Sequence, residues 1–425
     1  MKVVIMAGGK GTRIQSINSE VPKPMIQILD KPILQYQIEG LEKQGYSDII
    51  LVVGFLGQAI IDYFGDGSKF GVHISYITED EPLGTAGALY LLKNELSEDF
   101  LLLNGDIIFD IDIKRFYDHH VRMGGLATLF THPNNHPYDS GVIIASEEGQ
   151  VLNWLHKEDQ RLWYKNRVNA GLHMLSPNIL ASMTELKKLD LDRDILKPLI
   201  PSGKLFVYDS PEYVKDMGTP DRYKSVIHDI KSGKVQAKNL SRKQKAIFLD
   251  RDGTINVYKG FLKDIEDFEL IDGVAEAIRS INESGYLAIV VTNQPIIARG
   301  DATFTQLQEI HNKMETLLGQ KGAYVDDIFY CPHHPHKGYD GEVAELKIEC
   351  ECRKPKPGML LDAAKKYNID LSQSYMVGDS ESDMEAGHSA GCKTVLIGKD
   401  NAMFTGLTDF ICSLLNKEGE NERWL

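Results

Sequence analysis

Residues 1–13 read MKVVIMAGGKGTR, with an apolar run before Gly8 and Gly9. An unbroken run of β-branched and other apolar residues is typical of a strand buried on both faces of a parallel sheet. Glycines directly after such a strand let the backbone approach a ligand closely and turn N–H groups toward phosphate oxygens. The run is too short for the core of a signal peptide. We therefore predict a strand over residues 2–7 and a phosphate loop after it, although the glycines alone fit a tight turn without a ligand equally well.

Similar apolar runs recur along the chain, and amphipathic segments separate them. The runs cover residues 48–54, 100–106, 246–250, 287–293 and 374–379. Within residues 32–45, Leu34, Ile38 and Leu41 recur at helical spacing. Alternation of strands and helices predicts an α/β fold with right-handed strand–helix–strand units.

The length and charge of the chain limit its domain organisation and its partners. The 425 residues exceed one domain of roughly 100–200 residues, and a polar, Lys-rich stretch over residues 228–245 separates two series of apolar runs. We therefore expect one domain over residues 1–236, a linker over 237–245 and a second domain over 246–425. The formal net charge of −14 argues against a nucleic-acid partner.

The remaining composition favours a cytoplasmic chain. No apolar stretch reaches the 18 or more residues that a membrane span needs, so we expect no membrane partner. Five cysteines, an odd number, fit a reducing compartment rather than a disulfide framework. The sequence leaves the oligomeric state open, and a homo-oligomer is compatible with it.

Charged and small residues of the first half follow its predicted strands, where ligand sites of α/β proteins form. Asp106 ends one apolar run and Asp216 precedes a turn, and two carboxylates with phosphate oxygens make a typical Mg²⁺ site. Arg13 and Lys23 would place positive charge against a triphosphate. The small residues 83–87 suit close contact with a flat base.

The segments GGKGTR, Pro22-Lys23-Pro24, LGTAGAL, NGD and DMGTP, in this order, resemble the sugar-1-phosphate nucleotidyltransferases, a Rossmann-like family, over about residues 1–230. The resemblance implies nucleotide contacts by Gly8, Gly9, Gly11, Arg13 and Lys23, Mg²⁺ ligation by Asp106 and Asp216, base contact by Gly84, and sugar-phosphate contacts by Lys157, Asn169 and Gly171. It also implies attack of a sugar 1-phosphate oxygen on the α-phosphorus of a nucleoside triphosphate, with Mg²⁺, Arg13 and Lys23 stabilising the charge. The chain departs from the family at His156-Lys157-Glu158, where Glu-Lys-Pro is usual, which puts the sugar hydroxyl contacts in doubt.

The second half begins with a pair of carboxylates at the end of a strand. Asp250 and Asp252 stand two residues apart in DRDGT, so their side chains share one face of an extended chain. Such a pair allows one carboxylate to attack phosphorus and the other to protonate the leaving oxygen. The further polar residues near strand ends, or in a charged segment between them, are Thr292, Asn293, Arg353, Lys354, Asp379 and Asp383.

Cysteines of the second half indicate a metal site. Cys331, His333, Cys350 and Cys352 have the donor types and the close spacing of a tetrahedral, structural Zn²⁺ site. We expect Cys392 and Cys412 to be unligated, buried packing residues.

The second half resembles the haloacid dehalogenase phosphatases and, among them, the D,D-heptose 1,7-bisphosphate phosphatases, through DRDGTIN, TNQ, IARG, CPHHP, CRKPKPGM and YMVGD. The resemblance implies a fold with a small zinc loop and no large cap, Asp250 as nucleophile and Asp252 as general acid and base. It implies Mg²⁺ on Asp250, Asp379 and the Asp252 carbonyl, and phosphate or substrate contacts by Thr292, Asn293, Arg353 and Lys354. Asp383 would support this site. Two departures are Pro295-Ile296 after TNQ and Ser380 where relatives often have Lys.

The two halves together predict a bifunctional enzyme. Removal of the 7-phosphate from heptose 1,7-bisphosphate leaves heptose 1-phosphate, a substrate of the kind that the first half activates. We expect GTP as the nucleotide and GDP-heptose as the product, with Mg²⁺ in both domains. The alternatives are a hexose-1-phosphate nucleotidyltransferase fused to a histidinol-phosphatase-like enzyme, or one half that senses sugar nucleotides without catalysis.

Overall fold

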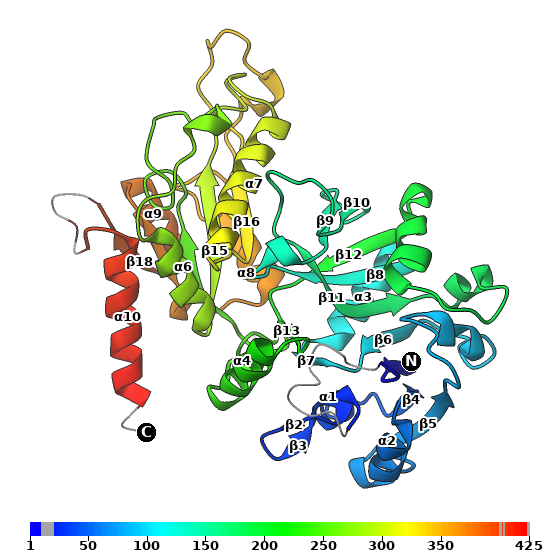
Figure 1. Cartoon of the computed structure of the whole chain (residues 1–425). Coiled ribbons are helices and arrows are strands. Elements are labelled where there is room, and N and C mark those ends of the chain that lie inside the picture. The colour runs from blue at the N-terminus through cyan, green and yellow to red at the C-terminus, as the bar shows by residue number, and fades with distance from the viewer. Residues whose placement is uncertain (10–20, 399–401, 403, 423–425) are drawn as a thin grey trace. The chain divides into compact units, whose positions relative to one another are not determined.

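The computed structural model describes residues 1–9, 21–398, 402 and 404–422, with the backbone alone for 417–422. It divides into two compact units (Figure 1). Unit 1 consists of Met1–His132, Ile143–Leu155 and Val168–Gln236, and unit 2 consists of Pro133–Val142, His156–Arg167 and Ala237–Leu425. Two short segments of the first half therefore group with the second half.

A nine-stranded sheet forms the centre of unit 1. Its strands are β1 (Val3–Met6), β4 (Asp48–Val53), β5 (His73–Thr78), β6 (Phe100–Asn104), β8 (Ala127–His132), β9 (Val142–Ala145), β10 (Val151–Leu155), β11 (Val168–Leu175) and β12 (Leu205–Asp209). They follow the order β10-β9-β11-β6-β1-β4-β5, with β8 paired to β11 and β12. β1 is parallel to β4 and β6, as the apolar runs predict, whereas β11 is antiparallel to β6 and β8.

Helices cover both faces of this sheet. The helices α1 (Ile33–Glu42), α2 (Gly57–Phe64) and α3 (Ile113–Met123) pack on one face, and Leu34, Ile38 and Leu41 of α1 are fully buried there, which confirms the predicted helix. The other face carries short helical segments, which are Gly87–Leu92, Pro177–Ser182, Leu191–Leu196 and Lys197–Ser202.

Smaller elements complete unit 1. Two antiparallel pairs are β2 (Gln27–Ile28) with β3 (Lys31–Pro32) and β7 (Ile107–Asp110) with β13 (Tyr213–Asp216). The helix α4 (Pro220–Lys231) starts where the Thr219 hydroxyl accepts a hydrogen bond from the Arg222 N–H, which is a typical helix cap. α5 (Lys234–Ala237) follows it, and the 3₁₀ turns Lys23–Met25 and Ser68–Phe70 lie in the loops.

Unit 2 contains a five-stranded parallel sheet of order β16-β15-β14-β17-β18. Its strands are β14 (Lys245–Leu249), β15 (Tyr286–Asn293), β16 (Asp327–Cys331), β17 (Tyr375–Gly378) and β18 (Lys393–Leu396). The helices α6 (Val274–Glu283), α7 (Phe304–Gln320) and α10 (Leu407–Glu422) pack on one face, and α8 (Gly358–Tyr367) and α9 (Glu381–Ala390) pack on the other (Figure 1). The 3₁₀ turns of this unit are Pro137–Asp139, Ile265–Asp267, Ala344–Leu346 and Leu371–Gln373.

The segment 237–245, expected as a linker, is packed into unit 2. Lys238, Asn239, Leu240 and Gln244 are buried. The Gln244 side chain donates to the carbonyl oxygens of Asn239 and Arg242, and its backbone pairs with the chain around Ile369. The residues with which the second series of strands starts are therefore fixed by packing.

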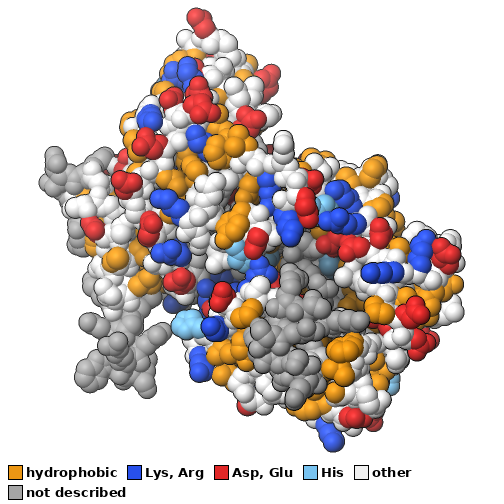
Figure 2. Space-filling model, in the orientation of Figure 1, with side chains coloured by type: hydrophobic (Ala, Val, Ile, Leu, Met, Phe, Trp, Pro, Cys, Tyr) orange, Lys and Arg blue, Asp and Glu red, His pale blue; other side chains and the backbone are white. Residues whose placement is uncertain are grey.

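Acidic and basic side chains are interspersed on the face of each unit that Figure 2 shows. In the part of the chain that the structure describes, no helix is long and apolar enough to cross a bilayer. The predicted α/β class, with several buried parallel strands in each half, is confirmed.

Unit 1 contains a buried histidine that makes its stability dependent on pH. His173 of β11 is 1% exposed, and neither ring nitrogen has a hydrogen-bond partner among the described residues. Burial lowers the pKa of His173 to about 3. The folded chain therefore keeps the ring neutral, while the unfolded chain binds a proton as the pH falls below its ordinary value of about 6.5.

We predict that His173→Leu makes the protein less sensitive to acid. Stability that depends on the neutral ring is complete above pH 6.5 and is lost as the pH falls toward 3, which amounts to about 2 kcal/mol at pH 5. The difference in thermal unfolding between pH 7.5 and pH 5.0 should shrink in this variant. His228→Leu, a change at an exposed position, is the control and should leave the difference as it is in the wild type.

Candidate active sites

Gly8 lies in a tight place at the end of β1. A Cβ atom there would come within 2.2 Å of the Glu79 carboxylate and 3.3 Å of the Gly54 nitrogen, so a side chain would displace the loop. Burial raises the pKa of Glu79, which follows β5 and accepts a hydrogen bond from the Leu83 N–H. Gly9 is exposed and faces open space. Gly11 and Arg13, the other predicted nucleotide residues of this loop, lie outside the described residues.

The two carboxylates predicted to bind Mg²⁺ in unit 1 lie at neighbouring backbone positions. Asp216 ends β13 opposite Ile107 of β7, and the Met217 N–H donates to the Asp106 carbonyl at 2.9 Å. Lys23 forms an ion pair with the Asp106 carboxylate. Two carboxylates at one strand end are the oxygen donors that Mg²⁺ prefers, so the residues present fit the ion.

Asp216 keeps its negative charge although it is partly buried. Burial acts to raise its pKa, but the Arg222 guanidinium, at 2.9 and 2.7 Å from the two carboxylate oxygens, and the Gly218 N–H outweigh burial. Lys23 adds to this effect, and the pKa of Asp216 lies below its ordinary value. Arg222 was not predicted, because the sequence does not reveal that its side chain folds back from α4 onto the Asp216 carboxylate.

The residues implied for the sugar lie next to those implied for the metal. Gly171 has a φ of +77°, and a Cβ atom there would come within 2.6 Å of the Asn104 amide, which stands two residues before Asp106. The Asn169 amide donates to the Asp192 carboxylate at 3.4 Å. The structure thus brings Asn169 and Gly171 to the same strand end as the acidic pair.

Asp192 is a candidate that the sequence did not reveal. Burial, together with the negative charge of Asp190, raises the pKa of Asp192 to about 7, while the hydrogen bond from Asn169 and the charge of Arg193 oppose the rise. A carboxyl group that titrates near neutrality beside a predicted ligand residue is typical of a functional site. Several acidic residues over 190–194 gave no sign of which one would be desolvated.

The predicted base loop packs closely on the segment that carries Asp192. Gly84 has a φ of +79°, and a Cβ atom there would come within 2.4 Å of the Leu189 carbonyl oxygen. The Thr85 hydroxyl accepts a hydrogen bond from the Leu191 N–H at 2.7 Å. The structure thus holds the loop 83–87 in place through backbone contacts.

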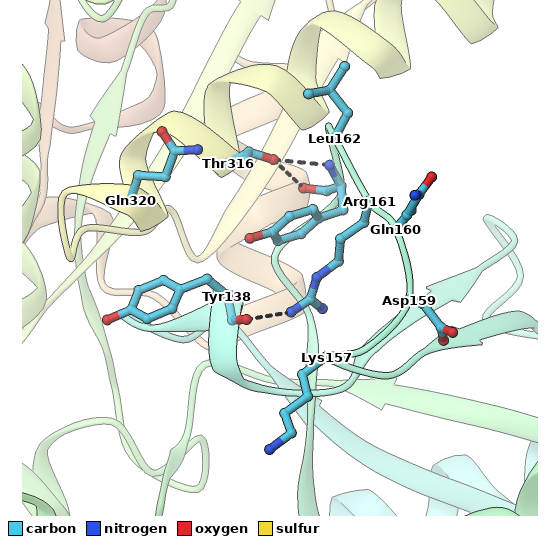
Figure 3. A pocket seen from close by; sticks show the side chains of 9 residues that line it. Tyr138, Lys157, Asp159, Gln160, Arg161, Leu162, Thr316 and Gln320 are labelled. Carbon is cyan, nitrogen blue, oxygen red and sulfur yellow. Dashed lines mark hydrogen bonds between the residues drawn. The ribbon is translucent and has the colours of Figure 1, made fainter.

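Lys157 has a different environment, because its segment belongs to unit 2. It lines an open pocket of about 730 Å³ with neighbours of its own segment and with Thr316 and Gln320 of α7 (Figure 3). The Arg161 guanidinium in this pocket donates to the carbonyl oxygens of Pro137, Tyr138 and Ser140 and is therefore structural. The contact of Lys157 with a sugar phosphate stays a prediction.

In unit 2, one lysine joins the predicted nucleophile to a second carboxylate. The Lys354 ammonium lies 2.7 Å from Asp250 and 2.6 Å from Asp383, and it donates to the Val291 carbonyl at 2.8 Å. All three charged side chains are buried. Burial raises the pKa of Asp250, and Lys354 opposes this rise while Asp383 adds to it. The Asp383 carboxylate also accepts a hydrogen bond from the Ser380 N–H at the start of α9, and its support of the site stays a prediction.

Asp252 is held by donors on both oxygens. Arg251 donates to both at 3.0 and 2.8 Å, Asn256 donates to one at 3.0 Å, and Gln294 donates to the other at 2.8 Å. Burial acts to raise the pKa of Asp252, but the Arg251 charge and these hydrogen bonds outweigh it and lower the pKa. Arg251, Asn256 and Gln294 were not singled out from the sequence, although all three stand within motifs that were quoted.

The remaining predicted phosphate and metal residues lie around these two aspartates. Asn293 exchanges two hydrogen bonds of 3.0 Å with the Lys354 backbone, and the Thr292 hydroxyl accepts from Gln294. A Cβ atom on Gly253 would come within 2.3 Å of Asp379. Oxygen atoms of Asp250, Asp379 and Asp383 lie within 4.8 Å of one another, a donor set that fits Mg²⁺.

The four predicted zinc ligands form one cluster. The Sγ atoms of Cys331, Cys350 and Cys352 lie 3.2 to 3.5 Å apart, and the His333 Nδ1 atom lies 3.3 Å from Cys352 and 3.6 Å from Cys331. Bonds of about 2.3 Å to a tetrahedral ion place sulfur atoms about 3.7 Å apart, a few tenths of an ångström more than in this cluster. Hydrogen bonds, above all that with Cys331, lower the pKa of Cys352 to about 5, whereas the hydrogen bond with Cys352 raises the pKa of Cys331 and burial raises that of Cys350. The thiolate that a metal needs is therefore favoured at one of the three sulfur atoms.

Arg353 links this cluster to the phosphatase site, because it donates to the His333 carbonyl at 3.2 Å. The two other cysteines differ from each other. Cys392 is buried, as predicted, whereas the prediction for Cys412 is wrong because this residue is exposed on α10. The helix turns Ile411 and Leu414 toward the core instead, and the sequence shows no difference between the two cysteines.

Comparisons with known proteins find relatives of both halves of the chain. Residues 2–233, more than half of the chain, match the nucleotidyl transferase family, and residues 351–407 match a HAD-hydrolase-like family. The chain is 46% identical over 158 residues to D-glycero-beta-D-manno-heptose-1,7-bisphosphate 7-phosphatase of Yersinia pestis, which covers 37% of this chain and 82% of that protein. The enzyme of the same name from Escherichia coli K12 is 45% identical over 158 residues, with 37% and 81% covered. Among solved structures, HddC from Yersinia pseudotuberculosis is 28% identical, with 54% of this chain and 99% of that chain covered and a TM-score of 0.47.

The chain therefore belongs, through residues 2–233, to the nucleotidyl transferase family of enzymes. Its second half belongs to the HAD-like phosphatases and, within them, to the family of the D-glycero-beta-D-manno-heptose-1,7-bisphosphate 7-phosphatases. The two families that the sequence motifs predicted are thus confirmed, and so is their fusion in one chain. The Cys/His cluster is compatible with a metal site.

We predict that Cys350→Ser removes a metal ion from the protein. Elemental analysis of the purified wild type should find about one zinc per chain, and the variant should hold less than half of this amount, because three remaining donors bind zinc more weakly. The variant should also lose phosphatase activity on heating sooner than the wild type does. Cys412→Ser at the exposed cysteine is the control, and equal zinc in all three proteins would contradict a site at the cluster.

We predict that Asp192→Asn changes how sugar 1-phosphate binding depends on pH. With a pKa of about 7, Asp192 is ionised above neutrality. We expect the ionised form to accept hydrogen bonds from sugar hydroxyls more strongly than the neutral form does. The ratio of the KM of the variant to that of the wild type should therefore rise about three- to tenfold between pH 6 and pH 8. Titration of the substrate phosphate affects both proteins alike, so a constant ratio would contradict the role of Asp192.

Proposed function

We propose that this chain catalyses two consecutive steps in the activation of a heptose. Unit 2 removes the 7-phosphate of D-glycero-D-manno-heptose 1,7-bisphosphate, and unit 1 joins the resulting heptose 1-phosphate to a nucleotide, with GTP as the expected donor and GDP-heptose as the product. The fusion itself carries this proposal. Relatives of the second half are named for removal of a 7-phosphate from a 1,7-bisphosphate, which leaves the 1-phosphate that a nucleotidyl transferase uses.

The arrangement of unit 2 supports hydrolysis through an aspartyl phosphate. An Asp250 oxygen attacks the phosphorus atom, the bond to the sugar oxygen breaks, and Asp252 gives that oxygen a proton. Water then attacks the phosphorus atom, the bond to the Asp250 oxygen breaks so that phosphate leaves, and Asp252 accepts the proton of the water. Lys354, placed between Asp250 and Asp383, compensates the negative charge at the reacting carboxylate.

The hydrogen-bond donors around Asp252 favour the second step, in which water attacks the aspartyl phosphate. They lower the pKa of Asp252 and keep it as the base that activates water. A phosphate dianion beside it has the opposite effect, because a like charge raises the pKa of a carboxyl group. Substrate binding thus favours the protonated form that the first step needs.

The arrangement of unit 1 supports transfer without a covalent intermediate. An oxygen of the sugar 1-phosphate attacks the α-phosphorus of the nucleotide and pyrophosphate leaves, so the site has to align two anions and neutralise their charge. Gly8 and Gly9 let the phosphates approach β1, and Lys23, beside Asp106, supplies positive charge. Arg13 keeps its predicted role on the same phosphates.

Metal ions complete both sites in this proposal. In unit 1, Asp106 and Asp216 would hold Mg²⁺, and in unit 2, Asp250, Asp379 and the Asp252 carbonyl would hold a second Mg²⁺. When bound, the ion supplies positive charge that stabilises the developing charge on phosphate oxygens. The Cys/His cluster would hold a structural Zn²⁺. The free cysteines suit a reducing compartment such as the cytoplasm, which stays a prediction.

A substrate panel tests the proposed function. The purified protein receives heptose 1,7-bisphosphate of either anomer, each nucleoside triphosphate in turn and Mg²⁺, while phosphate and pyrophosphate release are followed and the products are identified by mass. We expect phosphate release first, then pyrophosphate with one nucleotide and a nucleotide-heptose product. Turnover with histidinol phosphate or mannose 1-phosphate, and none with the heptose substrates, would contradict the assignment.

We predict that single substitutions separate the two activities. Asp250→Asn removes the nucleophile and should lower phosphate release by about a thousandfold or more, with pyrophosphate release from added heptose 1-phosphate unchanged. Asp106→Asn should have the opposite pattern, because it removes a carboxylate of the unit 1 site. Each variant is the control for the other, and loss of both activities from either change would show that the two sites are not independent.

A further inference from the structure

A buried glutamine of α1 contacts the turn that carries Asp106 in unit 1. Gln37 is 1% exposed, and its side-chain amide donates to the carbonyl oxygen of Asn104 and to that of Ile107, both at 2.8 Å. Carbonyl oxygens only accept hydrogen bonds, so the nitrogen of the amide must face both of them. The two amide hydrogens of one side chain therefore hold both ends of the turn 104–107.

The helix α1 does not depend on this amide for its own position. Leu34, Ile38 and Leu41 are fully buried and hold α1 on the sheet. Burial of three large apolar side chains stabilises such packing more than the hydrogen bonds of one amide do. The amide oxygen of Gln37 is buried and has no hydrogen-bond partner among the described residues. Within this part of the chain, the Gln37 side chain thus forms its hydrogen bonds with the turn alone.

The end of the turn at Ile107 lies at an open strand edge. Among the described strands, β7 pairs with β13 alone, so its other edge has no neighbouring strand. The Ile107 residue is buried, and its carbonyl accepts the bond from Gln37. A buried carbonyl that loses its donor is costly, and the backbone must shift to find another partner. Gln37 therefore fixes a part of the turn that strand pairing leaves open.

Other contacts hold the middle of the turn. The Gly105 N–H donates to the Met6 carbonyl of β1 at 2.9 Å, and the Asp106 carbonyl accepts from the Met217 N–H at 2.9 Å. A Cβ atom on Gly105 would come within 2.8 Å of the same Met6 oxygen, so the turn is closely packed on that side. The ends of the turn, which these bonds do not hold, are the places where Gln37 acts.

The turn determines how far apart the two carboxylates of unit 1 lie. Asp106 stands within it, and Asp216 is paired with Ile107, the next residue, in the register of β7 and β13. A shift of the turn therefore moves Asp106 relative to Asp216. If the chain holds the two carboxylates in place only part of the time, the apparent affinity for an ion falls by the fraction of the competent arrangement.

We propose that Gln37 is a positioning residue of the transferase site, which keeps the Asp106 carboxylate in place beside Asp216 for Mg²⁺ by holding both ends of the turn 104–107. Gln37 acts through the turn and not by contact with the ion or a substrate. The inference rests on the proposed function for the role of the acidic pair, but the anchoring of the turn can be measured without any substrate.

Gln37→Met in the full chain tests the inference, with Gln35→Met as matched control. Methionine keeps the length of the side chain and loses both donors. Gln35 lies on the same helix, but its amide contacts the side chains of Glu39 and Tyr63. For Gln37→Met we expect the Mg²⁺ concentration at half-maximal pyrophosphate release to rise about three- to tenfold, with the rate at saturating Mg²⁺ within about twofold of the wild type. Gln35→Met should match the wild type in both.

Phosphate release by unit 2 of the same chain is the internal control for folding and should be unchanged. An unchanged Mg²⁺ requirement of pyrophosphate release in Gln37→Met would overturn the inference. So would a loss of rate that saturating Mg²⁺ does not restore, because a general loss of structure has that pattern. If Gln37→Met fails to fold, Gln37→Asn, which keeps the amide and shortens its reach by one methylene group, takes its place with the same outcomes.

Hydrogen exchange gives a second readout that requires neither activity nor metal. Without Mg²⁺, the amides of Gly105 and Met217 should exchange about tenfold or more faster in Gln37→Met than in Gln35→Met, because the turn opens more readily. Equal exchange in the two variants would overturn the inference.

Failure of the inference is distinguishable from failure of the proposed function. The wild type is first assayed with heptose 1-phosphate and GTP, and absence of turnover there contradicts the function alone. The Mg²⁺ comparison is then made with the sugar 1-phosphate and the nucleotide that the wild type does use in the substrate panel. The exchange measurement on the turn keeps its meaning in either case.

Discussion

Both sites depend on positive charge, because their acidic side chains repel the phosphate groups that the proposed reactions bring next to them. In unit 2, the Lys354 ammonium supplies this charge by lying between Asp250 and Asp383, and the backbone of the same lysine is fixed by Asn293. In unit 1, Lys23 and Arg222 take the corresponding places beside Asp106 and Asp216. A parallel sheet suits this chemistry, because neighbouring strands end at the same edge and bring side chains from distant parts of the chain together.

Those strand ends are also the reason that so much could be predicted from the sequence. Apolar runs mark the buried strands, and ligand sites of α/β proteins form at the polar residues that follow them, such as Asp106 and Asp250. The cysteine cluster was predictable for a similar reason, since Cys331 and Cys352 offer thiolates at a spacing that a metal requires. In both cases the residues that indicate the chemistry lie within short segments of sequence.

Features that depend on contacts between distant residues could not be predicted. Asp192 is one of several acidic residues in its segment, and only the fold shows which one is desolvated beside Asn169. The exposure of Cys412 follows from the rotation of a helix, which a single residue does not reveal. The antiparallel strand β11 and the grouping of residues 156–167 with unit 2 depend on partners that lie far away in sequence.

The assignment of residues 156–167 to unit 2 has a consequence for the order in which the protein can fold during synthesis. This segment leaves the ribosome about 150 residues before the helix α7 on which it packs, an interval of on the order of ten seconds at ordinary rates of translation. During that interval Arg167 has no ion pair with Glu315, because Glu315 has not yet been synthesised. A nascent chain that ends with the transferase sequence therefore contains residues 156–167 without the helix on which they pack. We expect chaperones to bind such an incompletely packed segment.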